Sequence, residues 1–174
     1  MIMRKISKFR WIIRRSWKLP LARKIMYVEA AIRLISAWAL IRLVPYSIWR
    51  GLLGKAGPPT FEGLTGEADK AVAAEIASLH FVIHRVFGTR FTCLMLALSA
   101  RGMLKVRGIP SELILGVNRK SADRHASKLG AHAWVTSCSV DVIGHEGSEG
   151  FIPVATYSLY HNQRHPKIAS RANR

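Results

Sequence analysis

Apolar residues recur at intervals of three and four along residues 67–87, which is the spacing of one face of an α-helix. Glu67 and Asp69 fall in the first turn, where the helix dipole favours acidic side chains. Gly88 is a typical residue at a helix end. The repeated apolar positions are Val72, Ile76, Leu79, Ile83, Val86 and Phe87. The pattern predicts a helix over residues 67–87.

A second apolar helix is predicted from Cys93 to about Val106, with Thr92 as its N-terminal cap. After Gly108 the pattern changes to short apolar runs and to alternation, which are typical of strands. The expected strands cover residues 112–117, 131–137, 140–144 and 151–157. Residues 118–130, between the first two strands, are expected to form a polar loop at the mouth of a cleft.

The first 53 residues are expected to form a basic helical extension. Ile6, Phe9, Ile13 and Trp17 lie at helical spacing in residues 1–19. Pro20 then suits the first turn of a second helix, and Pro45 ends or kinks it. The apolar stripe of this second helix consists of Leu21, Ile25, Val28, Ile32, Ile35 and Ala39.

Residues 54–66 hold four glycines and two prolines, which predict a linker. The chain is therefore divided into an extension over residues 1–53, the linker, a domain over residues 67–160 and a basic tail over residues 161–174. Deletion of the extension is expected to leave the domain over residues 67–160 intact, because that domain follows the linker.

Composition excludes several classes of protein. A hydrophobic content of 49% argues against disorder, and two cysteines are too few for a disulfide framework, so a reducing cytoplasm is expected. The net charge is +17, and residues 1–55 hold 13 cations and one acid, Glu29. Such asymmetry indicates an anionic partner. We expect the extension to pack on the domain; a membrane surface or a partner protein is the alternative, and nucleic acid is disfavoured because no base-reading motif is present.

The candidate chemistry lies in Cys93 and His132. Cys93 stands in the first turn of its predicted helix, where unpaired N–H groups and the helix dipole stabilise a thiolate. His132 lies on a later predicted strand with Trp134 on the same face, where the indole can shield the imidazole from water. A thiol at a helix start and an imidazole on a strand can form the nucleophile and base of a cysteine enzyme.

Five motifs, in this order, resemble the B-type leader peptidases of lasso peptide biosynthesis, which are transglutaminase-like cysteine proteases. The motifs are Cys93-Leu94, Ala97-Leu98, Arg107-Gly108-Ile109-Pro110-Ser111-Glu112-Leu113, Leu115-Gly116-Val117 and Ala131-His132-Ala133-Trp134-Val135. The similarity runs from about residue 67 to about residue 157. It implies an α+β fold with a papain- or transglutaminase-like core, in which the cysteine helix packs on an antiparallel sheet that carries the histidine.

The resemblance implies Cys93 as the nucleophile and His132 as the base. The family's third member is an acid about a dozen residues after the histidine, where this chain has Gly144 and His145. Asp141 is our choice for that role, with Glu146, or a dyad oriented by a backbone or polar group, as alternatives. Cys138 lies in a predicted turn and is a poor nucleophile candidate.

The resemblance further implies removal of the leader from a lasso precursor peptide, together with a leader-binding recognition protein and an ATP-dependent cyclase as partners. An acyltransferase, or a non-catalytic module that binds peptide or membrane, is the alternative. No cofactor is implied.

His80 and His84 lie one turn apart on their predicted helix, but no third ligand is evident, so no metal site is expected. Both are interpreted as residues at a partly exposed helix edge. The expected location is the cytoplasm, with peripheral attachment to the inner membrane surface as an option.

Overall fold

The computed structural model describes residues 20–57, 66–118 and 130–159. The described helices are α2 (Leu21–Leu43), α3 (Tyr46–Trp49), α4 (Glu67–Phe87) and α5 (Cys93–Val106), with 3-10 turns η1 (Arg50–Leu53), η2 (Gly88–Arg90) and η4 (His145–Gly147). The described strands are β1 (Lys55–Ala56), β2 (Ser111–Asn118), β3 (Ala131–Ser137), β4 (Val140–Ile143) and β5 (Phe151–Leu159). The predicted helix at residues 1–19, most of the loop at 118–130 and the tail at 161–174 lie outside the described residues.

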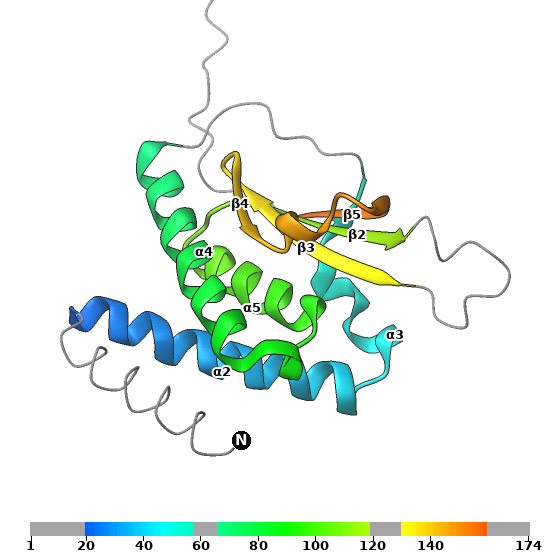
Figure 1. Cartoon of the computed structure of the whole chain (residues 1–174), viewed down its shortest axis with the longest axis horizontal. Helices are drawn as coiled ribbons and strands as arrows, with labels where there is room; N and C mark the ends of the chain where they lie inside the picture. The colour runs from blue at the N-terminus through cyan, green and yellow to red at the C-terminus, as the bar shows by residue number, and fades with distance from the viewer. Residues whose placement is uncertain (1–19, 58–65, 119–129, 160–174) are drawn as a thin grey trace, which may run out of the picture.

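The strands form one antiparallel sheet in the order β1-β5-β2-β3-β4. Helix α5 packs against β2, β3 and β4, while α2 and α4 pack against α5. Figure 1 shows these three helices on one side of the sheet. This arrangement confirms the predicted α+β class, with the cysteine helix against the sheet that carries His132.

The core lies between α5 and the sheet. Ala97, Ala100 and Met103 of α5 are completely buried, as are Leu113 of β2 and Val135 of β3. The two alanines let the helix axis come close to its neighbours, because they have no side chain beyond Cβ. Its contacts with the sheet and with both long helices make α5 the element around which the other helices are placed.

Helix α2 packs on α5 through a different face from the stripe named in the sequence. Its buried residues are Met26, Ala30, Leu34 and Ala37. The stripe from Leu21 to Ile35 points to solvent instead. Small residues at Ala30 and Ala37 allow a close approach to α5, which branched side chains would prevent. Packing selected the face with the better fit, although both faces are apolar.

A buried arginine ties the chain after α2 to the sheet. Arg101 of α5 donates to the backbone carbonyl of Leu53 and, at 2.8 Å, to that of Tyr157. Burial lowers the pKa of Arg101 to about 10. Nearby, Lys55 pairs with Ser158 in the β1–β5 ladder. The start of the predicted linker is therefore regular structure bound to the sheet, and the domain boundary at that linker stays a prediction.

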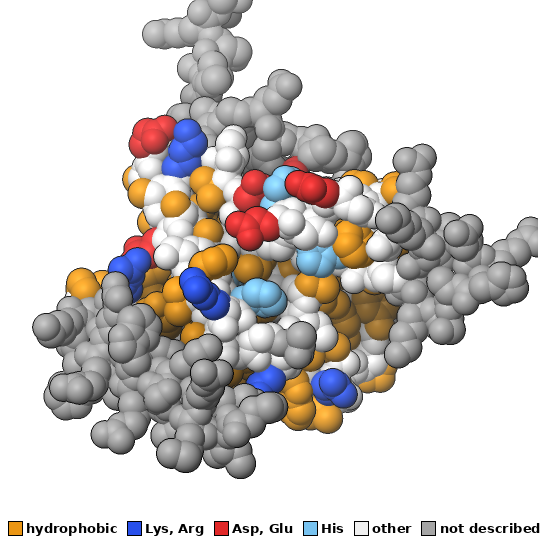
Figure 2. Space-filling model, in the orientation of Figure 1, with side chains coloured by type: hydrophobic (Ala, Val, Ile, Leu, Met, Phe, Trp, Pro, Cys, Tyr) orange, Lys and Arg blue, Asp and Glu red, His pale blue; other side chains and the backbone are white. Residues whose placement is uncertain are grey.

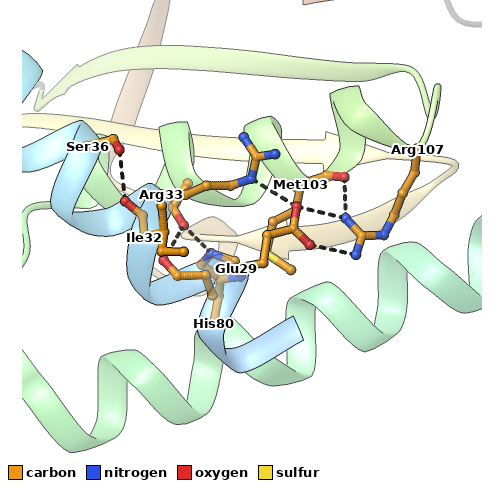
Figure 3. Close-up of polar contacts among 9 residues, drawn as sticks. Glu29, Ile32, Arg33, Ser36, His80, Met103 and Arg107 are labelled. Carbon is orange, nitrogen blue, oxygen red and sulfur yellow. Dashed lines mark hydrogen bonds and ion pairs between the residues drawn. The ribbon is translucent and has the colours of Figure 1, made fainter. Parts of the chain in front are cut away.

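An ion-pair network at the C-terminal end of α5 holds α2 in place (Figure 3). Arg107 donates to both carboxylate oxygens of Glu29, at 2.7 and 3.1 Å, and Arg33 donates to the same carboxylate at 3.0 Å. Partial burial raises the pKa of Glu29, but the hydrogen bonds from Arg107 and Arg33 outweigh it and leave that pKa below its usual 4.5. Two cations therefore share one carboxylate between two helices.

A buried histidine joins the three helices. His80 of α4 contacts the Ile76 carbonyl at 2.9 Å through Nδ1 and the Ser99 hydroxyl of α5 at 3.0 Å through Nε2. Ser99 also donates to the Ala30 carbonyl of α2 at 3.4 Å. Burial lowers the pKa of His80, and the Ile76 carbonyl opposes this shift only in part. The expectation of a helix-edge residue is wrong for His80, because contacts with α2 and α5 enclose it.

We expect Glu29→Gln to destabilise the fold by about 1–3 kcal/mol at neutral pH, because two guanidinium groups lose their charged acceptor. The pKa of Glu29 is lower in the folded state, so its stabilisation is present above about pH 4.5 and is lost as the pH falls through the folded value. Thermal melting of both proteins at neutral and acidic pH measures this. Glu75→Gln removes an exposed ion pair with Arg23 and is the control, with a loss of less than about 0.5 kcal/mol. Equal losses in the two variants would contradict the special role of Glu29.

Candidate active site

Cys93 is the first residue of α5, as the sequence predicted. The Thr92 side chain caps this helix by accepting a hydrogen bond from the Met95 N–H at 3.3 Å. Cys93 is partly buried and packs against the core cluster. The helix dipole favours negative charge at this end of a helix, and the Cys93 sulfur lies at that end.

His132 lies near the start of β3, and a backbone group orients its ring. Its Nε2 lies 2.7 Å from the carbonyl oxygen of Gly144. A carbonyl oxygen can only accept, so Nε2 carries the proton in this contact. In the neutral ring Nδ1 is then the unprotonated nitrogen, and it is available to act as a base.

Aromatic side chains cover the imidazole. Trp134 stacks with His132 at a centroid distance of 5.9 Å and an interplanar angle of 25°, and Phe151 lies 5.0 Å away. The Trp134 ring crosses β2 at Gly116, where a Cβ atom would come within 2.9 Å of the indole. Glycine at position 116 therefore makes room for the indole that flanks His132. The sequence predicted Trp134 on the same face of the strand as His132, as a shield for the imidazole.

Gly144 can hold its carbonyl beside His132 because it is a glycine. Its φ of +85° belongs to the left-handed region, which residues with a side chain rarely adopt. A Cβ atom at this position would lie 2.7 Å from the Ala133 carbonyl oxygen. This is the position, twelve residues after His132, at which the resembled family has its acid. In this chain a backbone carbonyl group from that position lies beside the imidazole.

Asp141 does not lie beside His132. In the β3–β4 ladder it pairs with Thr136, four residues or about 13 Å along the strand from His132. Its carboxylate is exposed and lies 3.5 Å from Nδ1 of His145. Glu146, the alternative acid, is also exposed. The geometry therefore favours the backbone group among the three options that the sequence left open.

The thiol and the imidazole lie on neighbouring elements but are not hydrogen-bonded to each other within the described residues. Ala133 and Val135 belong to the core that α5 packs against, while His132 and Trp134 occupy the alternate positions of β3. The Cys93 sulfur and Nδ1 of His132 would have to come closer to form a hydrogen bond.

The remaining candidates are placed as follows. Cys138 lies in the turn between β3 and β4 with a φ of 53°, and its sulfur is 3.5 Å from the Ser137 hydroxyl. In the part of the chain that the structure describes, no group of three or more His, Cys, Asp or Glu side chains could hold a metal ion.

Three residues beside His132 were not identified as site residues from the sequence: Gly144, Gly116 and Phe151. Only Gly116 left a sequence signal, because a glycine inside a strand often marks close approach.

Residues 40–156, about two thirds of the chain, match the transglutaminase-like superfamily. The chain belongs to this superfamily, which includes cysteine peptidases and acyltransferases, and membership indicates a cysteine-dependent enzyme in general. The matched segment runs from α2 into β5 and contains both Cys93 and His132. No curated protein and no solved structure shows significant similarity to the chain.

We expect Gly144→Ala to disturb the tautomer of His132, because the added Cβ strains the backbone and displaces the carbonyl that accepts from Nε2. Nitrogen NMR of the imidazole should show Nε2–H alone in the natural protein and a mixture of tautomers in the variant. Stability should fall by about 1–3 kcal/mol. Gly150→Ala is the control, since a Cβ there meets nothing within 4 Å. An unchanged tautomer in a folded Gly144→Ala protein would remove Gly144 as the orienting group.

Proposed function

We propose that this protein is a cysteine peptidase that removes the leader from a ribosomally made lasso precursor peptide. Membership of the transglutaminase-like superfamily supports a cysteine-dependent reaction. Within the site, the proposal is supported by Cys93 at a capped helix start and by His132, whose Nε2 is held by the Gly144 carbonyl so that Nδ1 is the unprotonated nitrogen of the neutral ring. The five motifs that resemble the lasso leader peptidases supply the substrate class.

In this proposal the sulfur of Cys93 attacks the scissile carbonyl carbon of the precursor. Nδ1 of His132 takes the thiol proton and then gives it to the leaving amine as the peptide bond breaks. The leader part stays on the sulfur as a thioester, and water hydrolyses it to release the carboxylate and the thiol. The backbone N–H of Cys93, in the first turn of α5, can donate to the tetrahedral oxyanion.

The Gly144 carbonyl takes the role of the third catalytic group in this scheme. It fixes the tautomer and the ring orientation, and as an acceptor it stabilises the imidazolium that forms during proton transfer. A carbonyl is neutral, so it stabilises that cation less than a carboxylate does. A low turnover at neutral pH is the expected consequence.

The catalytic contact between Cys93 and His132 has to form when substrate binds. Hydrogen bonds of this kind are often long in proteins without substrate and tighten in the complex. A recognition protein that holds the leader, and the cyclase that takes the core peptide, are the partners that the resemblance implies. In this proposal, binding of the leader beside β3 moves His132 toward the thiol.

Two other functions remain as candidates. In an acyltransferase the thioester would pass to an amine rather than to water, and the mass of the product distinguishes the two reactions. A non-catalytic peptide-binding module is favoured by one observation, the lack of a hydrogen bond between Cys93 and His132 in the described structure. Release of the leader from the precursor by the purified protein would exclude a non-catalytic peptide-binding module.

We expect Cys93→Ala to abolish leader removal, with a loss of about a thousandfold or more, because no other group supplies the nucleophile. Cys138→Ser is the matched control and should keep most of the activity, since Cys138 stands in a turn away from the helix start. Cleavage of a precursor peptide, followed by mass spectrometry, measures both. Iodoacetamide that inactivates the enzyme while modifying Cys138 alone would reverse the assignment.

We expect His132→Ala to be about as damaging as loss of Cys93, because the two act as one unit. Asp141→Asn should change the rate by less than about threefold, since its carboxylate faces His145 rather than His132. The pH profile of the cleavage rate is the informative measurement, because a positioning role would move it. A shifted profile with a large loss in Asp141→Asn would restore Asp141 as the orienting acid.

A further inference from the structure

The outward face of α2 is apolar along the whole helix. We name as the α2 outer stripe the residues Leu21, Ile25, Val28, Ile32 and Ile35, whose exposed fractions lie between 59% and 74%. Leu43 continues this face toward the C-terminal end and is also exposed. The opposite face, with Ala30 and Leu34, packs on α5. A helix that is apolar on both faces is typical of one that is covered on both sides.

The stripe continues into an apolar groove between α2 and α5. This groove has a volume of about 660 Å³ and is lined by Ile25, Val28 and Ile32 of α2, together with Leu52 and Leu98. Arg33 and Lys105 also line it. Figure 2 shows hydrophobic side chains beside Lys or Arg side chains at the end of the molecule where α2 approaches α3. Apolar surface and positive charge therefore occur together.

The charged residues around the stripe are mostly positive. Residues 20–57 contain six Lys and Arg and one acid, Glu29, and the Glu75 carboxylate of α4 lies 3.4 Å from Arg23 of α2. Glu29 is engaged by Arg33 and Arg107 and is not available to an outside cation. Whatever covers the stripe has to tolerate or neutralise this positive field.

Charge decides between the candidate occupants. A second copy of the chain would bring the same cations to a two-fold contact, with no free carboxylate among residues 20–57 to pair with them. Residues 1–19 carry seven cations and no acid, so they would add to the repulsion. Both occupants place like charges together, which is unfavourable, whereas an anionic surface is complementary.

We propose that the α2 outer stripe is a docking surface for an anionic lipid bilayer, with α2 lying in the plane of the interface. The stripe runs from residue 21 to residue 35, or about 21 Å, and its residues form one outward row, as a flat bilayer surface requires. The exposed Trp38, on the flank of α2, and the exposed Tyr46 just after α2 are side chains that suit the headgroup region. None of the described helices has the length and apolar character of a transmembrane span.

Co-sedimentation of the full chain with vesicles tests this docking surface. The protein should sediment with phosphatidylglycerol-containing vesicles, much less with pure phosphatidylcholine, and binding should fall as salt rises from about 0.1 M to about 1 M. The double variant Ile32→Gln, Ile35→Gln should bind at least about tenfold more weakly, because it removes apolar area from the interface. Glutamine preserves helix propensity, so the melting temperature should stay unchanged.

The matched control is Phe81→Gln, Val86→Gln, which removes exposed apolar side chains from α4 and should bind vesicles as the natural protein does. Cys93→Ala should also bind normally, because docking does not rest on the proposed reaction. A natural protein that fails to sediment with anionic vesicles at low salt would overturn the proposal. So would a stripe variant that binds vesicles normally but loses self-association in light scattering, or loses binding to an acidic helical peptide.

Discussion

The burial of α5 is the constraint on which the rest of the structure depends. Its residues contact the sheet on one side and α2 and α4 on the other, and Ala97, Ala100 and Met103 are fully enclosed. Because α5 is packed between the sheet and these two helices, its first residue has a fixed place. Cys93 therefore stands at the start of a rigid helix, where a nucleophile can be aimed with little cost in entropy.

Polar groups inside this packing connect the helices rather than weaken them. His80, Ser99 and the Ala30 carbonyl form a chain of contacts from α4 through α5 to α2. Arg101 satisfies backbone carbonyls of η1 and β5 in the same way. Buried polar groups are costly when unpaired, so each of these contacts favours one arrangement of the elements over its alternatives.

The site shows how a backbone can replace a side chain. Gly144 supplies the acceptor for His132, and Gly116 gives space to the indole that covers the imidazole. Both roles depend on the absence of a Cβ atom. A neutral carbonyl is a weaker electrostatic partner for a histidine than a carboxylate is.

The sequence by itself determined the helices at 67–87 and 93–106, the strand at 131–137 and the cap at Thr92, because periodicity and capping are local properties of the chain. It also placed Cys93 at a helix start and His132 on a strand. Only the tertiary structure decided which face of α2 is buried, since both faces are apolar and the fit to α5 selects between them. Tertiary structure alone also decided what orients His132, because a carbonyl group occurs in every residue and its direction depends on the fold around Gly144.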